Sequence, residues 1–220
     1  MMREQYGQKL RLLHREMIEM GSMCERAIAL AMEALGKNKP ELLPKVFQVD
    51  AGIDKKERDI ESLCLKLLLL QQPVAGDLRD VSAALKMISD MERIGDQASD
   101  IAEIGKTLLG QEGEQPQDLR EMAREAISMV NDSIDAFIRR DLKLARAVIA
   151  YDDVVDRWFD RIREELVRCI AADSTKGAYY LDLLMIAKYL ERIADHATNI
   201  AEWVEYSITG VRSKDGVAPE

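Results

Sequence analysis

Apolar residues recur every three or four positions along most of the chain, with charged residues between them. This spacing gathers the apolar side chains on one stripe of an α-helix. Prolines, glycines and short polar stretches interrupt the pattern and define the ends of the helical segments. We predict helices over residues 5–35, 41–70, 74–109, 117–138, 142–170 and 175–208.

Three residues near the predicted helix starts allow finer predictions. Pro44 lies early in the second segment. The first turn of a helix tolerates proline and the interior does not, so we expect that helix to start properly near Pro44. Asp141 and Ser174 precede the fifth and sixth segments. Both are predicted N-caps, because short polar side chains accept hydrogen bonds from the free N–H groups of a first turn.

A sequence repeat divides the chain into two similar halves. Residues 91–103 read Met-Glu-Arg-Ile-Gly-Asp-Gln-Ala-Ser-Asp-Ile-Ala-Glu, and residues 190–202 read Leu-Glu-Arg-Ile-Ala-Asp-His-Ala-Thr-Asn-Ile-Ala-Glu. The offset is 99 residues, from Glu92 to Glu191. An ordered repeat at this separation indicates one module used twice.

The stretch between the halves has the composition of a linker. Residues 110–116 contain two glycines, a proline and no apolar residue. Short loops force neighbouring helices to run antiparallel. We therefore predict an all-α protein of two tandem antiparallel three-helix bundles, at residues 1–110 and 117–209. A disordered tail is expected at residues 210–220.

Composition and charge narrow the class of protein. The 220 residues are 47 % hydrophobic with few aromatics, and helix-forming residues predominate. The formal charge of −9 argues against direct binding of nucleic acid. The three cysteines are far apart, which predicts neither disulfides nor a zinc site and fits a reduced cytoplasm. The polar start and the lack of an apolar run of about 20 residues predict no membrane insertion.

Acidic residues form rows on four of the predicted helices. At about 100° per residue, the rows on the third and sixth segments fall roughly opposite the apolar stripes, on the expected surface. These rows are Glu92, Asp96, Asp100 and Glu103, and Glu191, Asp195, Asn199 and Glu202. The second segment carries Asp50, Asp54, Glu57 and Glu61 beside its apolar stripe, and the fifth carries Asp152 and Asp156. Phe159 stands where Glu57 would align, so the second acidic patch is poorer.

The acidic rows admit two interpretations. Carboxylates about 6 Å apart on one helix, met by a second acidic helix, can hold Mg²⁺, Mn²⁺ or Fe. Alternatively, the rows form a solvated face that is neutralised by counterions and by Arg93 and Arg192, and the residues alone favour neither reading. A buried di-iron enzyme is disfavoured, because no Glu-x-x-His pair occurs. His14 and His196 are interpreted as structural, and no nucleophile or phosphate-loop motif is present.

The two Glu-Arg-Ile-x-Asp-x-Ala segments carry a resemblance to a known family. They are preceded by Lys-Met-Ile-Ser-Asp-Met in the first half and by Met-Ile-Ala-Lys-Tyr-Leu in the second. With these flanks they resemble the PhoU family, the phosphate-uptake regulators of bacteria and archaea. The resemblance extends from the first helix to Ile208. It implies two three-helix bundles, a cytoplasmic protein and no catalytic chemistry.

The resemblance also implies divalent metal ions, Mg, Mn, Fe or Zn, in single or multinuclear clusters on the surface. The positions that match the family's metal motifs are Asp50, Asp54, Glu92, Asp96 and Asp100 in the first half, and Asp152, Asp156, Glu191, Asp195 and Asn199 in the second. The family often has His directly after the motif aspartate, and Asn four residues after that aspartate. The second repeat keeps both, whereas the first has Gln97 and Asp100. The extra carboxylate predicts tighter metal binding in the first half.

The resemblance further implies a regulatory role. When phosphate is plentiful, such a protein couples the ATPase subunit of a phosphate-specific ABC transporter to a sensor histidine kinase, and keeps the phosphate regulon off. The alternative is a PhoU-like accessory module of another phosphate or cation transporter, and the sequence does not separate the two. Long helices with polar outer faces suit the binding of partner domains or of a second copy, so a homodimer is also expected.

Overall fold

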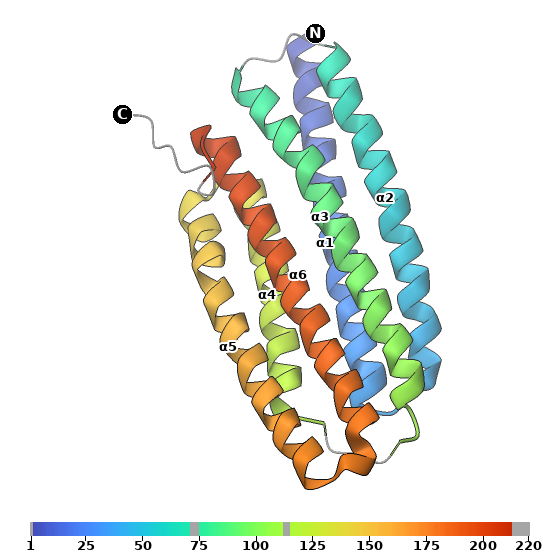
Figure 1. Cartoon of the computed structure of the whole chain (residues 1–220). Helices are drawn as coiled ribbons and strands as arrows, with labels where there is room; N and C mark the ends of the chain where they lie inside the picture. Colours follow the sequence, from blue (N-terminus) through green and yellow to red (C-terminus); the bar gives the residue numbers. More distant parts are fainter. Residues whose placement is uncertain (1, 71–74, 112–114, 213–220) are drawn as a thin grey trace.

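The computed structural model describes residues 2–70, 75–111 and 115–212, and these ranges are almost entirely helical (Figure 1). Two short 3₁₀ turns, Pro40–Leu42 and Ser174–Lys176, precede α2 and α6. The described residues contain no strand, which confirms the all-α prediction. The long helices are α1 (Met2–Gly36), α2 (Leu43–Leu70), α3 (Ala75–Leu108), α4 (Gln117–Arg139), α5 (Leu142–Ala172) and α6 (Gly177–Thr209).

The observed helix ends test the predicted start signals. The α2 helix begins at Leu43, so Pro44 lies in its first turn as expected. The side chain of Asp141 accepts a hydrogen bond from the Leu144 N–H at 3.0 Å, which confirms this cap. The prediction for Ser174 is wrong. Ser174 lies in the 3₁₀ turn before α6, and Asp173 caps that turn, because its carboxylate accepts the Thr175 N–H two residues on at 3.0 Å. The α6 helix itself begins after Lys176 without a side-chain cap.

Some sequence predictions fall outside the described residues. These are the break between the second and third helices at 71–74, the centre of the linker at 112–114, and the tail at 213–220. Of the predicted tail, the structure describes residues 210–212. Gly210 ends α6 in a left-handed conformation with φ of 82°, where glycine is favoured. The domain boundaries at 110 and 117 stay a prediction.

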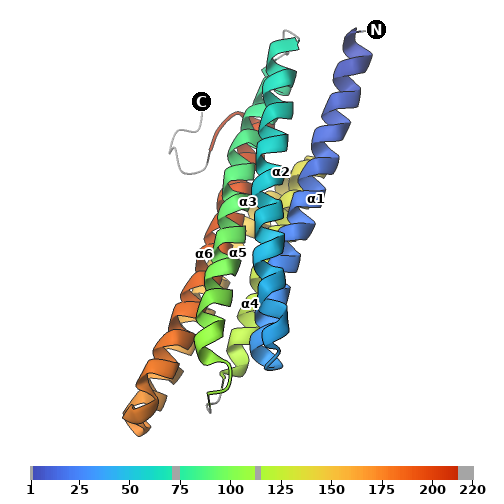
Figure 2. The same cartoon turned by 90° about the vertical axis from the view of Figure 1, so that its right-hand side faces the viewer.

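The helices form two groups of three that pack against each other (Figures 1 and 2). In the first group α1, α2 and α3 pack on one another, and in the second α4, α5 and α6 do so. This arrangement confirms the tandem three-helix architecture. The groups meet mainly through α3 and α6, with a smaller contact between α1 and α4. The buried apolar residues of both groups belong to one continuous core.

The two central helices, α3 and α6, run antiparallel along this contact (Figure 1). Asp90 of α3 accepts a hydrogen bond from the Asn199 amide of α6 at 3.3 Å. Further along, Thr107 of α3 donates to the Asp182 carboxylate near the start of α6 at 2.9 Å. The repeat matches Asp90 with Tyr189 and Asp100 with Asn199. Both matched pairs are joined across the contact, because Asp100 of α3 receives a hydrogen bond from Tyr189 of α6.

One surface assignment from the sequence is wrong. Glu202 was expected on an exposed acidic row, yet it is only 2 % exposed. Arg212 donates a hydrogen bond to the Glu202 carboxylate at 2.7 Å, and its guanidinium lies 4.0 Å from the Trp203 ring centroid. Helical periodicity gives no information about residues beyond the end of α6, and Arg212 is such a residue.

Candidate functional site

The acidic rows of α2 and α3 lie next to each other and form the first acidic cluster. Its members come from neighbouring helices of one hairpin, with their charges close enough to act on one another. The structure thus brings together all five carboxylates predicted for the first half and adds Glu57. The first acidic cluster comprises Asp50, Asp54, Glu57, Glu92, Asp96 and Asp100.

Asp50 is the most enclosed part of this cluster. Ser99 donates a hydrogen bond to Asp50 Oδ2 at 2.8 Å. The other oxygen, Oδ1, is buried and has no hydrogen-bond partner among the described residues. It lies against Gly95, where a β-carbon would come within 2.7 Å of it. Because a buried carboxylate oxygen without a partner is unfavourable, Asp50 is a group that a cation would stabilise.

Three carboxylates of the first cluster, Asp50, Glu92 and Asp100, have raised pKa values. Burial raises the pKa of Asp50, and the charges of Asp54, Asp96 and Asp100 raise it further, whereas the Ser99 hydrogen bond lowers it. Burial and then Asp96 raise the pKa of Glu92. Raised carboxyl pKa values indicate that the negative form lacks compensation in this environment. A proton or a metal ion would supply that compensation.

Two arginines compensate part of the cluster. Arg93 pairs with Asp96 at 3.0 Å and with Glu92 at 3.5 Å. Arg192 of α6 acts on Asp100, where its charge lowers a pKa that burial and Asp96 raise. This observation supports the alternative of an acidic face neutralised by arginine. The ion pairs of Arg93 are with the outer carboxylates, whereas the hydrogen bond to Asp50 comes from Ser99.

The second acidic cluster lies at the corresponding place between α5 and α6. It comprises Asp152, Asp156, Glu191 and Asp195, four of the five residues predicted for that half. Burial, followed by the charges of Glu191 and Asp152, raises the pKa of Asp195 to about 6. Burial also raises the pKa of Asp152, and Thr198 donates a hydrogen bond to its Oδ1 at 3.2 Å. This bond repeats the one from Ser99 to Asp50.

The fifth predicted residue of the second half, Asn199, is joined to the other bundle. Its amide donates to Asp90 Oδ1 of α3 at 3.3 Å, and His196 Nδ1 lies 2.9 Å from the same oxygen. The half-buried His196 therefore has a structural contact, in line with its interpretation from the sequence. This contact ties Asn199 to the α3–α6 interface.

Sequence reasoning missed several residues that shape the clusters. Ser99 and Thr198 hold Asp50 and Asp152, and Gly95 makes room for Asp50. The repeat offered a signal for the first two, because a hydroxyl residue occupies both matched positions. Lys188 was also missed. It forms an ion pair with Glu191 inside the second cluster.

The donor atoms of both clusters suit hard divalent cations, which prefer carboxylate oxygens. Within the described ranges, however, no three His, Cys, Asp or Glu side chains are arranged so that they could hold a metal ion. The residues fit a metal in chemical type, in proximity and in the unsatisfied oxygen of Asp50. Their present side-chain positions do not form a complete coordination sphere.

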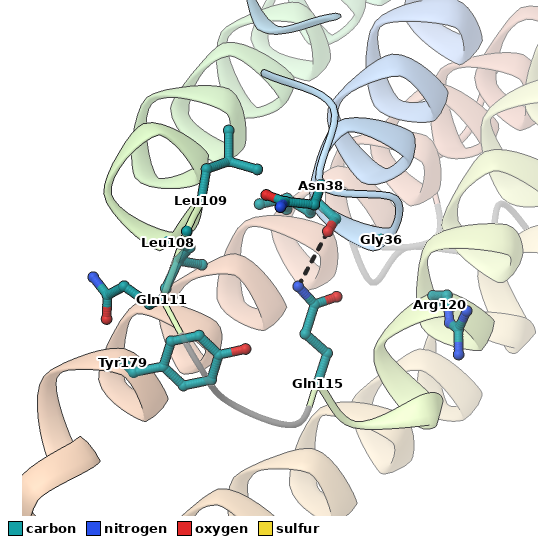
Figure 3. A pocket seen from close by; sticks show the side chains of 10 residues that line it. Gly36, Asn38, Leu108, Leu109, Gln111, Gln115, Arg120 and Tyr179 are labelled. Carbon is teal, nitrogen blue, oxygen red and sulfur yellow. Dashed lines mark hydrogen bonds between the residues drawn. The ribbon is translucent and has the colours of Figure 1, made fainter. Parts of the chain in front are cut away.

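A separate pocket lies near the C-terminal ends of α1 and α3 (Figure 3). Its volume is about 340 Å³, and Tyr179 of α6 lies on one side of it. Gln115 lines it and donates a hydrogen bond to the Leu35 carbonyl at 3.3 Å. Among the lining residues that the structure describes, Arg120 is charged and none is a carboxylate. The pocket is therefore distinct from both acidic clusters.

None of the helices in the described ranges combines the length and apolar character that a membrane span requires.

The model of the PhoU domain matches the chain twice, at residues 17–105 and 119–204. Each match falls within one group of three helices.

Relatives extend this match over nearly the whole chain. A PhoU homolog of Clostridium acetobutylicum, named a phosphate-specific transport system accessory protein, is 38 % identical over 96 % of this chain and 97 % of its own. A homolog of the same name from Pseudomonas aeruginosa is 35 % identical over 94 % of this chain and 86 % of its own.

Solved structures agree in fold. The crystal structure of PhoU from Pseudomonas aeruginosa gives a TM-score of 0.87 at 34 % identity, covering 94 % of this chain and all of that one. That of the phosphate transport system regulatory protein PhoU from Streptococcus pneumoniae gives 0.86 at 26 % identity, covering 94 % and 98 %. With both halves matched and relatives aligned almost end to end, this chain belongs to the PhoU family, whose members are accessory and regulatory proteins and not enzymes.

Proposed function

We propose that this protein regulates phosphate uptake by linking a phosphate-specific ABC transporter to a sensor histidine kinase. When phosphate is plentiful, it binds the transporter's ATPase subunit and the kinase, and the phosphate regulon stays off. The observation that carries the proposal is family membership over both repeats, with relatives named for the phosphate-specific transport system. The proposed site of action is the cytoplasm.

The shape of the molecule suits binding to partners. Long helices pack into an elongated body (Figure 2). Of the charged residues described, few are buried, among them Asp80, Glu202 and Glu205. Rigid helical surfaces of this kind recognise partner helices or domains. A homodimer is part of the proposal, since a second copy can use the same surfaces in a symmetric contact.

We also propose that the acidic clusters bind divalent metal ions, such as Mg, Mn, Fe or Zn, with the first cluster the stronger site. Asp50, Asp54, Glu92, Asp96 and Asp100 would hold the ion in the first half. Asp152, Asp156, Glu191, Asp195 and Asn199 are the candidates in the second. A bound ion would supply positive charge that joins two acidic helices, a structural and not a catalytic contribution. The buried, unpartnered oxygen of Asp50 supports this proposal.

Deletion of the gene tests the regulatory role. In high phosphate, a phosphate-starvation reporter should become active in the deletion strain and return to repression when the gene is restored. The tagged protein should co-purify with the transporter ATPase and the kinase. If repression is unchanged and neither partner is recovered, the regulatory role is refuted, and an accessory role at another phosphate or cation transporter is favoured.

A further inference from the structure

One difference between the two acidic clusters lies in a contact that joins the two helices of each cluster. In the first half, Ser89 of α3 donates a hydrogen bond to Glu57 of α2 at 3.5 Å. In the second half, the equivalent residues are Lys188 of α6 and Phe159 of α5. The Lys188 ammonium lies 5.5 Å from the centroid of the Phe159 ring. A hydroxyl and a carboxylate are thus replaced by an ammonium and an aromatic ring in the same cross-helix contact.

Lys188 acts on most of the second cluster. Its ammonium forms an ion pair with Glu191, whose side chain is only 15 % exposed. The charge of Lys188 also lowers the pKa of Asp195 and of Asp156, against burial and neighbouring carboxylates that raise both. The ring of Phe159 adds an attraction for a cation that leaves water only in part. The ammonium is therefore held over the cluster from both helices.

We infer that Lys188 is the resident counter-cation of the second acidic cluster and supplies there the positive charge that a divalent metal would otherwise bring. The first cluster is then the tight metal site, and the second binds a divalent ion only when the ion competes with Lys188. The inference rests on the proposed metal binding by the first cluster. It predicts one tight metal-binding half per chain, in spite of the repeat.

The charge balance of the two clusters agrees with this assignment. Carboxylates act on one another in both clusters, six in the first and six in the second once Asp153 and Asp160 are counted, but the second cluster also contains the Lys188 ammonium. Affinity for a divalent cation falls as ligand charge is removed. Arg93 is the nearest counterpart in the first half, but its side chain is 60 % exposed, against 44 % for Lys188.

The inference is tested by titrating the full-length protein with Mn²⁺. Calorimetry and Mn²⁺ electron paramagnetic resonance measure the affinity for the ion. The first cluster is removed by Asp96→Asn with Asp100→Asn, and this double variant should lose tight Mn²⁺ binding. Adding Lys188→Ser to the double variant introduces the residue type found at the matching position, Ser89. The triple variant should bind Mn²⁺ about tenfold or more tightly than the double variant. Lys188→Met removes the charge while keeping an unbranched side chain, and it should act in the same direction.

Matched controls separate charge from folding. Lys188→Arg keeps the positive charge and should restore nothing, while Ser89→Lys in the otherwise unchanged protein should weaken the first site. Melting with chelator shows whether each variant is folded. The inference is overturned if the double variant keeps tight Mn²⁺ binding, or if neither Lys188→Ser nor Lys188→Met gains any. The reporter assay in the deletion strain tests the regulatory role separately, so the two failures are distinguishable.

Discussion

Gly95 of α3 lies against the carboxylate of Asp50 on α2, so closely that a β-carbon at position 95 would stand 2.7 Å from Asp50 Oδ1 and 3.0 Å from Ile53 Cδ1. Glycine inside a helix costs roughly 0.5–1 kcal/mol relative to alanine. Its presence in the middle of a long helix is explained by the space that Asp50 needs. The second half has Ala194 at the matching position, so its cluster cannot be identical.

Gly95→Ala should therefore destabilise the protein, although alanine favours helix. Overpacking of a filled site costs about 1–3 kcal/mol, which exceeds the gain in helix propensity. We expect a lower free energy of unfolding in urea. Gly76→Ala is the matched control on the same helix, because nothing lies within 4 Å of a β-carbon there. A Gly95→Ala protein as stable as the Gly76→Ala protein would show that Asp50 moves aside at no cost.

Metal binding by the first cluster should raise thermal stability. An ion that binds only the folded state stabilises it by about 2.7 kcal/mol at a hundred times its Kd. The melting temperature with Mn²⁺ should exceed that with chelator in the unchanged protein. It should change little in the Asp96→Asn, Asp100→Asn double variant. An equal rise in both proteins would mean that the ion binds elsewhere.

The hydrogen bond from Ser99 to Asp50 should contribute to stability. Ser99→Ala leaves a partly buried carboxylate with one bond fewer, and we expect a loss of about 1 kcal/mol in chelator. Thr198→Ala tests the equivalent bond to Asp152, which is longer at 3.2 Å against 2.8 Å. The loss of unfolding free energy should be smaller for Thr198→Ala than for Ser99→Ala. Denaturation in urea measures both, and the reverse order would contradict the ranking by distance.

Asp195 of the second cluster should make the folded protein less stable as the pH rises. The pKa of Asp195 is raised from 3.8 to about 6 in the folded protein, by burial first and then by Glu191 and Asp152. Between these values the folded state holds a proton that the unfolded state has lost, so stability falls as the pH rises through this window. Asp195→Asn should therefore raise the melting temperature at pH 7 in chelator. The gain should shrink toward pH 4.

Asp173 provides a control, because its pKa is shifted in the opposite direction to that of Asp195. Hydrogen bonds from Thr175 lower the pKa of Asp173, so its carboxylate contributes stability above its unfolded pKa and loses it on acidification. Asp173→Asn should lower the melting temperature at pH 7 and have little effect in strong acid. Asp195 is an exposed residue, so screening by solvent reduces its effect on stability. The two variants must nevertheless shift in opposite directions at pH 7 for the assignment to hold.

The sequence by itself determined the helices, their order and the repeat, because these depend on local spacing. Apolar residues at three- and four-residue intervals define a helix wherever they occur, and Pro44 and Asp141 marked helix starts correctly through local backbone chemistry. The short connection within each half also made it predictable that the row with Asp50 would meet the row with Asp96. Both rows belong to one hairpin, so few arrangements were available.

Only the tertiary structure decided which flanks of α3 and α6 became buried. Asn199 contacts Asp90 because helices from opposite halves of the chain pack together, and Glu202 is buried with Arg212, which lies beyond the end of α6, as its hydrogen-bond donor. Helical periodicity fixes the angle between side chains on one helix but carries no information about a second neighbour. The same reason applies to Lys188 over Phe159 and to Asp50 against Gly95, since these contacts depend on the separation and rotation of two packed helices.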